Sequence, residues 1–516
     1  MPEATKDAAR SIPGAARRSF IDSHFTGIIL IIGVLLRILS SFLSANNGGD
    51  AWAREGITAT WLSHPSLKLN FDAWLPFHFW LMGGLAAILG DNVRLAGRLL
   101  SFLAGTASLF VFYKVVRTLY NESAAQIGLT AFVLYSLGIA YSSTSSSEAV
   151  YLLFVLLGLL GYFRYRQYCS LSDLAFSGVF FSFGAATRYE AWSLIFAIGL
   201  LLVFSIWKSQ GEVGFLTSLR PLAIFSLTAG FFPVIIMAHN WIAFHHLLYA
   251  VTMNHDWVAE QLAFSQASLA YRLLLFPGVL FLTLTPIVVF ASVYGFVLSF
   301  RTRIGTEFAF LTIFFTAVQF YQIASGGEMA FARYTITLGT FLIVLGAYGL
   351  AAVFQKFPNY SAILRRSFAG VLLLNLLAIW AISSSSNHFS EKFASISPVL
   401  RYAHRIDSLS AFLRPRLNSE DRVVIDDYNS ESNIVAQALG LPLPAKSRAF
   451  LAGIRPASEL PGYVESEHPR FIIYGQRGIL SKTLVLGCDA PLALPKAEVR
   501  CPYQNDIYKV YEVIYK

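Results

Sequence analysis

The sequence predicts an all-α polytopic membrane protein with about 11 transmembrane helices and a small C-terminal α/β domain. The first observation is composition: 55% of the 516 residues are hydrophobic and only 13% are charged, whereas about 25% of residues in a soluble protein are charged. The second is that many apolar runs reach the roughly 20 residues that a helix needs to cross a bilayer. The third is that this pattern stops near residue 385, where charged residues and Pro-rich turns begin.

The basic residues orient the expected spans. Lys and Arg gather at the ends of apolar runs, where the insertion rule and anionic lipids place them, so the net charge of +9 does not indicate a nucleic-acid partner. The clusters are Arg17/Arg18, Lys114/Arg117, Arg164/Arg166, Lys208/Arg220, Arg301/Arg303 and Lys356/Arg365/Arg366. The expected spans are residues 26–45, 97–114, 124–141, 149–163, 173–187, 190–207, 219–239, 275–300, 306–324, 334–354 and 367–385.

If all the basic clusters face the cytoplasm, the spans alternate only when the apolar stretch Trp74–Gly90 does not cross the membrane. We therefore expect Trp74–Gly90 to form an interfacial helix within a long first outer loop, residues 46–96. Residues 1–25 then form a cytoplasmic tail, residues 26–385 the transmembrane module, and residues 386–516 an extracytoplasmic domain.

The C-terminal residues have the pattern of a small α/β domain. Arg422–Asp426 and Arg470–Tyr474 are typical of buried strands, a helical pattern near Ser432–Leu439 lies between them, and Tyr508–Tyr515 is typical of a closing strand. Alternation of strands and helices favours an α/β arrangement.

Two of the three cysteines, Cys488 and Cys501, fall in this domain, and Cys169 lies beside a cytoplasmic loop. Outside the cytoplasm Cys488 and Cys501 could form a disulfide across a short loop. Two cysteines also occur near each other by chance, so both interpretations stay open.

Asp50 is the most informative residue of the outer loops. It follows the first span, and a carboxylate at the exit of a membrane helix is costly unless it meets water, a metal ion or a substrate. Gly48 and Gly49 allow the backbone to turn sharply before it. An Asp that caps an interfacial helix is the alternative, but the neighbouring Trp52 and Glu55 favour a functional carboxylate.

Other polar residues of the outer loops have two interpretations each. Arg188 and Glu190 belong either to a site or to a structural pair in a tight turn, and Arg333 either binds substrate or anchors a helix end. Glu148 either belongs to the site or stabilises the N-terminus of the next helix. The loop histidines could hold zinc, although interfacial histidines are more often polar surface. The full set is Asp50, Arg54, Glu55, His64, Asp72, His78, Ser142–Glu148, Arg188, Glu190, His245, His246, His255, Asp256, Glu260, Arg272, Glu328 and Arg333.

The order of these motifs resembles the GT-C superfamily of integral membrane glycosyltransferases, and most of all the protein O-mannosyltransferase and aminoarabinose-transferase group. Asp50 matches the acidic motif of their first outer loop, Trp74–Leu81 matches their Pro- and aromatic-containing segment, and Glu148 falls where they place an acid in the second outer loop. The other matching segments are Arg94–Ser101, Thr187–Glu190 and Arg333–Tyr334. The resemblance covers residues 20–355.

The chain also departs from the pattern of this group. Asp50 is followed by Ala51 rather than a second acid, Pro76 replaces a pair of prolines, and Glu148 stands where Asp is common. Metal-dependent members use such acids as ligands, so a divalent metal remains possible here and no residue is assigned to one.

The resemblance implies an inverting glycosyltransferase that moves a sugar from a polyprenyl-phosphate donor to an acceptor at the outer face of the membrane, with the bacterial inner membrane as the expected location. Asp50 is the expected catalytic residue, and the acceptor is a glycan, a lipid or a protein. The expected substrate-binding residues are Glu55, His78, Glu148, Arg188, Glu190, Arg333 and Tyr334. A transporter or flippase of lipid-linked sugars is the alternative, although no clear internal repeat supports it. A structural or assembly subunit is a third interpretation.

Overall fold

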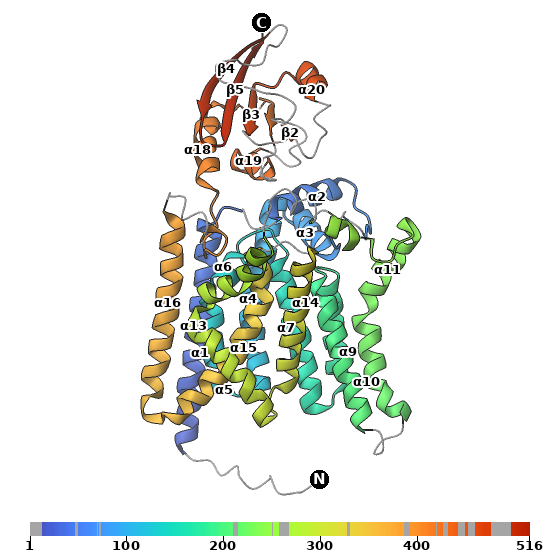
Figure 1. Cartoon of the computed structure of the whole chain (residues 1–516), viewed down its shortest axis with the longest axis vertical. Coiled ribbons are helices and arrows are strands. Elements are labelled where there is room, and N and C mark those ends of the chain that lie inside the picture. The colour runs from blue at the N-terminus through green and yellow to red at the C-terminus, as the bar shows by residue number, and fades with distance from the viewer. Residues whose placement is uncertain are drawn as a thin grey trace.

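The computed structural model consists of a long helical bundle and a small sheet domain at one end of it (Figure 1). The described residues are 13–46, 50–69, 71, 74–209, 215–249, 251–256, 258, 268–327, 331–385, 393–418, 420–426, 432–441, 449–451, 460–475 and 497–515. The predicted fold class, a helical membrane protein with a small C-terminal α/β domain, is confirmed.

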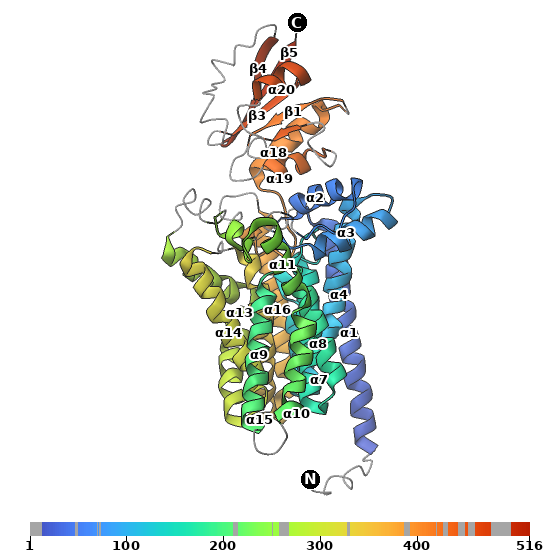
Figure 2. The ribbon, with the colours of Figure 1, turned by 90° about the vertical axis from the view of Figure 1, so that its right-hand side faces the viewer.

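The bundle is made of helices that run up and down along its long axis (Figures 1 and 2). They are α1 (Pro13–Leu43), α4 (Val93–Leu119), α5 (Glu122–Val133), α6 (Ser136–Ala140), α7 (Glu148–Tyr168), α8 (Leu171–Ala185), α9 (Glu190–Ser209), α10 (Phe215–Ala229), α11 (Phe231–Phe244), α13 (Leu269–Thr302), α14 (Thr306–Ser325), α15 (Ile336–Lys356) and α16 (Ser361–Ser384). Two 3₁₀ turns, η1 (Ala332–Thr335) and η2 (Pro358–Tyr360), precede α15 and α16.

Within the described residues, eight helices are long and apolar enough to cross a membrane, or nine if α10 and α11, bent by 55° against each other, form one span. The predicted span 124–141 falls on the shorter α5 and α6, and the predicted span 173–187 falls on α8, which has 15 residues. Every predicted span therefore corresponds to a helix or a broken helix, whereas the number of crossings stays a prediction.

Helix α15 lies at the centre of the bundle and packs tightly on α13. Glycine makes this approach possible: a Cβ on Gly295 of α13 would overlap the Leu345 carbonyl, and one on Gly349 would overlap the Ala291 carbonyl. Helix α13 is itself interrupted at Thr285, whose φ of 68° is non-helical, directly before Pro286. The central position of α15 fixes the turn η1 that leads into it.

Two short helices lie across the end of the bundle that carries the sheet domain, α2 (Ala51–Ser63) and α3 (Phe77–Ile88) (Figures 1 and 2). Helix α3 occupies the stretch Trp74–Gly90, and its 12 residues span only about 18 Å, against the roughly 30 Å of a bilayer core. It packs against α2 and α4. The prediction that this stretch forms a helix that does not cross agrees with this arrangement.

The C-terminal domain, described between residues 393 and 515, is built on one five-stranded sheet. The strand order is β2-β1-β3-β5-β4, with β1 parallel to β2 and β3, and β5 antiparallel to β3 and β4. The strands are β1 (Val423–Ile425), β2 (Ala449–Leu451), β3 (Phe471–Gly475), β4 (Ala497–Gln504) and β5 (Tyr508–Tyr515), and the helices are α18 (His404–Leu413), α19 (Ser432–Ala438) and α20 (Leu460–Glu467), with a 3₁₀ turn, η3 (Arg414–Arg416), after α18. The predicted strands β1, β3 and β5 and the helix α19 are confirmed.

The cysteine prediction is settled only in part. Cys169 is a free, exposed thiol, and Cys501 is disulfide-bonded. Cys488 lies outside the described residues, so the Cys488–Cys501 pairing stays a prediction.

Candidate active site

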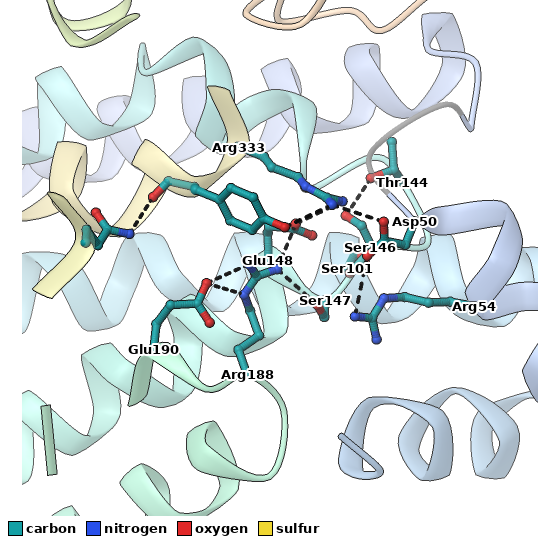
Figure 3. Close-up of polar contacts among 12 residues, drawn as sticks. Asp50, Arg54, Ser101, Thr144, Ser146, Ser147, Glu148, Arg188, Glu190 and Arg333 are labelled. Carbon is teal, nitrogen blue, oxygen red and sulfur yellow. Dashed lines mark hydrogen bonds and ion pairs between the residues drawn. The ribbon is translucent and has the colours of Figure 1, made fainter. Parts of the chain in front are cut away.

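Ionisable side chains from four separate elements meet in one place (Figure 3). They come from the start of α2, the start of α7, the turn between α8 and α9, and η1. We call the set Asp50, Arg54, Glu148, Arg188, Glu190 and Arg333 the charge cluster. It contains three carboxylates and three guanidinium groups.

Asp50 occupies the N-cap position of α2, but its side chain accepts no capping hydrogen bond from the described backbone. Its Oδ1 instead accepts from Nη2 of Arg333 at 3.0 Å, and its Oδ2 lies 3.9 Å from Nη2 of Arg54. Burial alone would raise the pKa of this carboxyl, but the positive charges of Arg333 and Arg54 outweigh burial and lower the pKa below its ordinary value. Capping of α2 therefore does not explain the contacts that the Asp50 side chain makes. With a lowered pKa, this carboxylate is ionised at neutral pH.

Glu148 is the first residue of α7 and is almost fully buried. Its Oε1 accepts from Nη1 of Arg188 at 2.9 Å and lies 3.7 Å from Nη1 of Arg333. The position in the first helical turn also favours a negative charge through the helix dipole. The structure is compatible with both interpretations of Glu148, as a residue of the site and as a charge that stabilises a helix N-terminus. Its carboxylate lies in the first turn of α7 and also near Arg188 and Arg333.

Arg188 forms the predicted turn pair with Glu190, in which Nε and Nη2 approach Oε1 at 2.8 and 2.6 Å. It also reaches Glu148, so the pair is part of the charge cluster rather than an isolated turn. Burial would lower the pKa of Arg188, but Glu190 and Glu148 outweigh it and raise the pKa well above its ordinary value. This guanidinium therefore stays charged although little water reaches it.

Tyr334 lies against both central arginines. The guanidinium carbon atoms of Arg188 and Arg333 lie 5.2 and 5.0 Å from the centre of its ring, a cation–π distance. Its hydroxyl oxygen accepts from Nη2 of Arg333 at 3.3 Å, and its carbonyl oxygen accepts from Nε2 of Gln319 at 3.0 Å. The ring of Tyr334 therefore packs against both guanidinium groups.

The backbone beneath the charge cluster is a buried loop, residues 142–147, which we call the serine loop. All six side chains are buried, and a Cβ on Gly97 or Gly105 of α4 would overlap Ser145 or Ser142. Ser101 of α4 donates to the carbonyl oxygen of Ser146 at 3.1 Å. Irregular backbone within a membrane protein needs such enclosed partners, so the two glycines make room for the loop that ends at Glu148.

Glu55 lies near the charge cluster but is held by different partners. Its Oε1 accepts hydrogen bonds from Ser145 at 2.6 Å and from Asn46, and its Oε2 lies 3.4 Å from Nε of Arg94. Burial raises the pKa of this carboxyl, opposed by the hydrogen bond from Ser145 and the charge of Arg94. Glu55 thus joins α2 to the serine loop and to α4, and does not point into the charge cluster with Asp50.

His78 is fully enclosed within the outer loop. Burial, followed by the charge of Arg54, lowers the pKa of its imidazole well below the ordinary value, and the backbone of Ser146 opposes the shift. His78 is therefore neutral at physiological pH.

Arg54 belongs to the charge cluster, although the sequence placed it only among the outer-face residues. Its guanidinium carbon lies 5.3 Å from the ring centre of Phe79. The signal in the sequence was its position four residues after Asp50 on a helix, a spacing that places two side chains on one face.

The histidines of the fourth outer loop that the structure describes lie outside the charge cluster. His245 ends α11, and His255 lies 3.8 Å from Asp256 at the surface. Asp72, Glu260 and Glu328 lie outside the described residues. In the part of the chain that the structure describes, no three His, Cys, Asp or Glu side chains gather in a way that fits a metal ion. Asp50 and Glu148 are paired with arginines instead.

Comparison with known proteins agrees with this architecture. Residues 63–236 match the family model of dolichyl-phosphate-mannose-protein mannosyltransferases, which is less than half of the chain. A search of curated protein sequences gives no match.

Three solved structures show the same fold over most of the chain. ArnT from Cupriavidus metallidurans in the apo state superposes with a TM-score of 0.58 at 12% identity, covering 95% of this chain and 98% of that one. The same protein bound to undecaprenyl phosphate gives 0.57 at 11% identity over the same shares. The archaeal oligosaccharyltransferase AglB from Archaeoglobus fulgidus, in complex with an inhibitory peptide and a dolichol-phosphate, gives 0.52 at 13% identity, covering 89% of this chain and 70% of that one.

The fold is therefore that of the GT-C glycosyltransferases among these solved structures, in a chain whose described residues include eight helices long and apolar enough to cross a membrane. The predicted resemblance to the protein O-mannosyltransferase and aminoarabinose-transferase group is confirmed at the level of this superfamily.

Proposed function

We propose that this protein transfers a sugar from a polyprenyl-phosphate donor to an acceptor, with the charge cluster as its active site. One observation carries the proposal: the side chain of Asp50 is 25% exposed, whereas those of Glu148 and Glu190 are 4% and 13% exposed. Asp50 is thus the carboxylate that a substrate can reach. The other two acids hold the arginines in place.

The arginines provide the donor-phosphate site of the proposal. Guanidinium groups donate paired hydrogen bonds that match the oxygens of a phosphate. Arg333 is the first candidate for binding the donor phosphate, because it already binds an oxygen of the Asp50 carboxylate. Arg188, which binds Glu148, is the second candidate. The undecaprenyl phosphate and dolichol-phosphate in the two related structures support a lipid phosphate as the ligand.

Asp50 is the proposed general base. The acceptor oxygen attacks the anomeric carbon, the bond between that carbon and the phosphate oxygen breaks, polyprenyl phosphate leaves, and the acceptor proton passes to the Asp50 carboxylate. A donor phosphate that shares Arg333 weakens the pairing that lowers the pKa of Asp50. Donor binding would therefore make Asp50 more basic. Attack from the face opposite the phosphate inverts the anomeric centre.

The rest of the proposal concerns location and partners. Helix α2, which begins directly after Asp50, and the C-terminal domain lie at the same end of the bundle (Figure 1). The positive-inside rule supports assigning that end to the outer face. The proposed location is the bacterial inner membrane, with the C-terminal domain extracytoplasmic. The acceptor would be a glycan, a lipid or a protein that meets the lipid-bound donor at the membrane edge. Transfer measured before and after chelation of divalent metal ions from the purified protein tests whether a metal assists the reaction.

The test measures release of undecaprenyl phosphate from a panel of donors that carry labelled pentoses and hexoses. Asp50→Asn keeps the size and the capping ability of the residue but removes its charge. A positioned base contributes about 10²–10⁴-fold, so the variant is expected to lose that much rate while it still binds undecaprenyl phosphate.

Asp91→Asn is the matched control, because Asp91 is an exposed carboxylate of the same outer loop. It is expected to turn over like the wild type. Near-normal turnover by Asp50→Asn would contradict its assignment as the base.

A further inference from the structure

Helix α2, which begins directly after Asp50, is held by the C-terminal domain. Trp52 is 7% exposed and packs in one hydrophobic cluster with the buried core of that domain, including Ile406 and Leu409 of α18 and Val435 of α19. Among the described residues, Trp52 is the one buried member of this cluster that the membrane module contributes. Its indole Nε1 finds no hydrogen-bond partner there, so the contact is apolar packing.

A second contact joins the same domain to α2 through an arginine of α4. Nη2 of Arg94 donates to the carbonyl oxygen of Leu441, just after α19, at 3.4 Å. Nε of Arg94 lies 3.4 Å from Oε2 of Glu55. Glu55 in turn accepts from Ser145 of the serine loop, which leads to Glu148. Two hydrogen bonds and an ion pair therefore connect the domain, through α4 and α2, to the serine loop that ends at Glu148.

The segment that leads into the C-terminal domain is fixed to the end of α1. The Ser40 hydroxyl donates to the carbonyl oxygen of Pro398 at 2.7 Å, and the backbone of Leu400 accepts from Ala45 at 2.8 Å and donates to the Ser44 hydroxyl at 3.0 Å. The domain therefore meets the membrane module at both its entry segment and its α19 face, which limits its freedom to tilt away.

Asp50 and Trp52 are two residues apart at the start of one helix, so a shift of the first turn moves both. We propose that the C-terminal domain is a positioning element of the active site: by seating Trp52 it fixes the start of α2 and thereby the Asp50 carboxylate opposite Arg333. The effect on turnover rests on the proposed transfer reaction. The effect of the domain on the order of α2, which we call the mechanical part of the proposal, does not depend on that reaction.

Hydrogen exchange of the full-length protein tests the mechanical part without any turnover. Trp52→Ala removes the side chain that packs in the C-terminal domain. It is expected to speed amide exchange at least about tenfold at Arg54, whose N–H closes the first turn of α2 by donating to the Asp50 carbonyl oxygen at 2.9 Å. Trp61→Ala is the matched control, since Trp61 lies at the other end of α2, packs on Gly83 of α3, and donates to the carbonyl oxygen of Ser66 at 2.8 Å. Its effect is expected in α3 and in the end of α2.

Turnover tests the consequence for catalysis. Displacing a catalytic group by about 1 Å costs up to about 10²-fold, so Trp52→Ala is expected to lower kcat about 10- to 100-fold with unchanged affinity for undecaprenyl phosphate. Trp52→Phe, which keeps an aromatic ring in the seat, is expected to recover most of the rate.

Three outcomes overturn the proposal: unchanged exchange in the first turn of α2 for Trp52→Ala, an equal loss of kcat for Trp61→Ala, or a loss confined to donor affinity. Failure of the proposed function looks different. In that case the wild type transfers no sugar from any donor, while Trp52→Ala still loosens the start of α2.

Discussion

The two ends of the helical bundle both carry arginine–carboxylate pairs, but they use them differently. At the end away from the C-terminal domain, Glu307 at the start of α14 accepts from Arg166 at 2.6 Å and from the Tyr162 hydroxyl at 3.0 Å, and the side chains of Arg166 and Glu307 are 35% and 29% exposed. At the other end, Glu148 and Arg333 are nearly enclosed, and each faces more than one opposite charge.

The difference shows what a local pair and a shared cluster can do. The Glu307 pair joins two helix ends in contact with water, where an ion pair contributes about 0–1 kcal/mol. The charge cluster encloses Glu148, Arg188 and Arg333 almost completely, so each of these groups depends on several others. The second arrangement also places two guanidinium groups, those of Arg333 and Arg54, around the partly exposed Asp50, which is the arrangement that the proposed lipid-phosphate donor would use.

The largest expected effect on stability is that of Glu148→Gln. Removing this charge leaves Arg188 with one carboxylate partner and Arg333 with only Asp50, and breaking a buried pair costs about 3–5 kcal/mol. Glu307→Gln is the matched control at the other end, with an expected cost of about 1 kcal/mol or less. The free energy of unfolding in detergent measures both. Equal losses would show that the two ends do not differ in the way described.

A smaller effect is expected for Arg333→Ala in donor binding. Loss of a charge-assisted hydrogen bond costs about 1.5–3 kcal/mol, so affinity for undecaprenyl phosphate is expected to fall about 10- to 100-fold. Arg333→Lys restores only part of it, because an ammonium lacks the paired donors of a guanidinium. Arg166→Ala, at the other end, is expected to bind normally. Unchanged affinity in Arg333→Ala would return this residue to the headgroup-anchor interpretation.

The smallest effect is the contribution of Asp50 to the dependence of stability on pH. Its pKa in the folded protein lies below the ordinary 3.8, so the folded state favours the ionised form. The resulting stabilisation is complete above pH 3.8 and is lost as the pH falls below 3.8 through the folded value. The difference in Tm between wild type and Asp50→Asn should therefore be constant from pH 7 to pH 5 and change only in stronger acid. A change centred near pH 6 would mean that the pKa is raised instead.

Much of the charge cluster was predictable from sequence. Asp50, Glu148, Arg188, Glu190 and Arg333 each stand at the end of an apolar run, and the alternation of spans assigns all of them to one face. Charges at the same face of a membrane protein gather, since isolated charges are costly there. The sequence could not predict which face of α2 points inward. Glu55, predicted to bind substrate, accepts a hydrogen bond from Ser145 in the structure.

The fold was predictable where the pattern was long and regular. Apolar runs identified the helices, and three of the five strands carried a clear apolar pattern. The strand β2 has only three residues, Ala449–Leu451, and is placed by its pairing with β1 rather than by its own sequence. The break between α5 and α6 falls at Leu134 and Tyr135, inside one apolar run, so the apolar pattern alone does not reveal it.

The four elements of the charge cluster are far apart along the chain, and this has a consequence for biogenesis. Asp50 and its hydrogen-bond partner Arg333 are separated by 283 positions. During synthesis, Asp50 and Glu148 enter the growing assembly long before Arg333 leaves the ribosome. Until Arg333 arrives, the early part of the chain can pair Asp50 only with Arg54 and Glu148 only with Arg188, so the insertion of η1 and α15 is the step that completes the charge cluster.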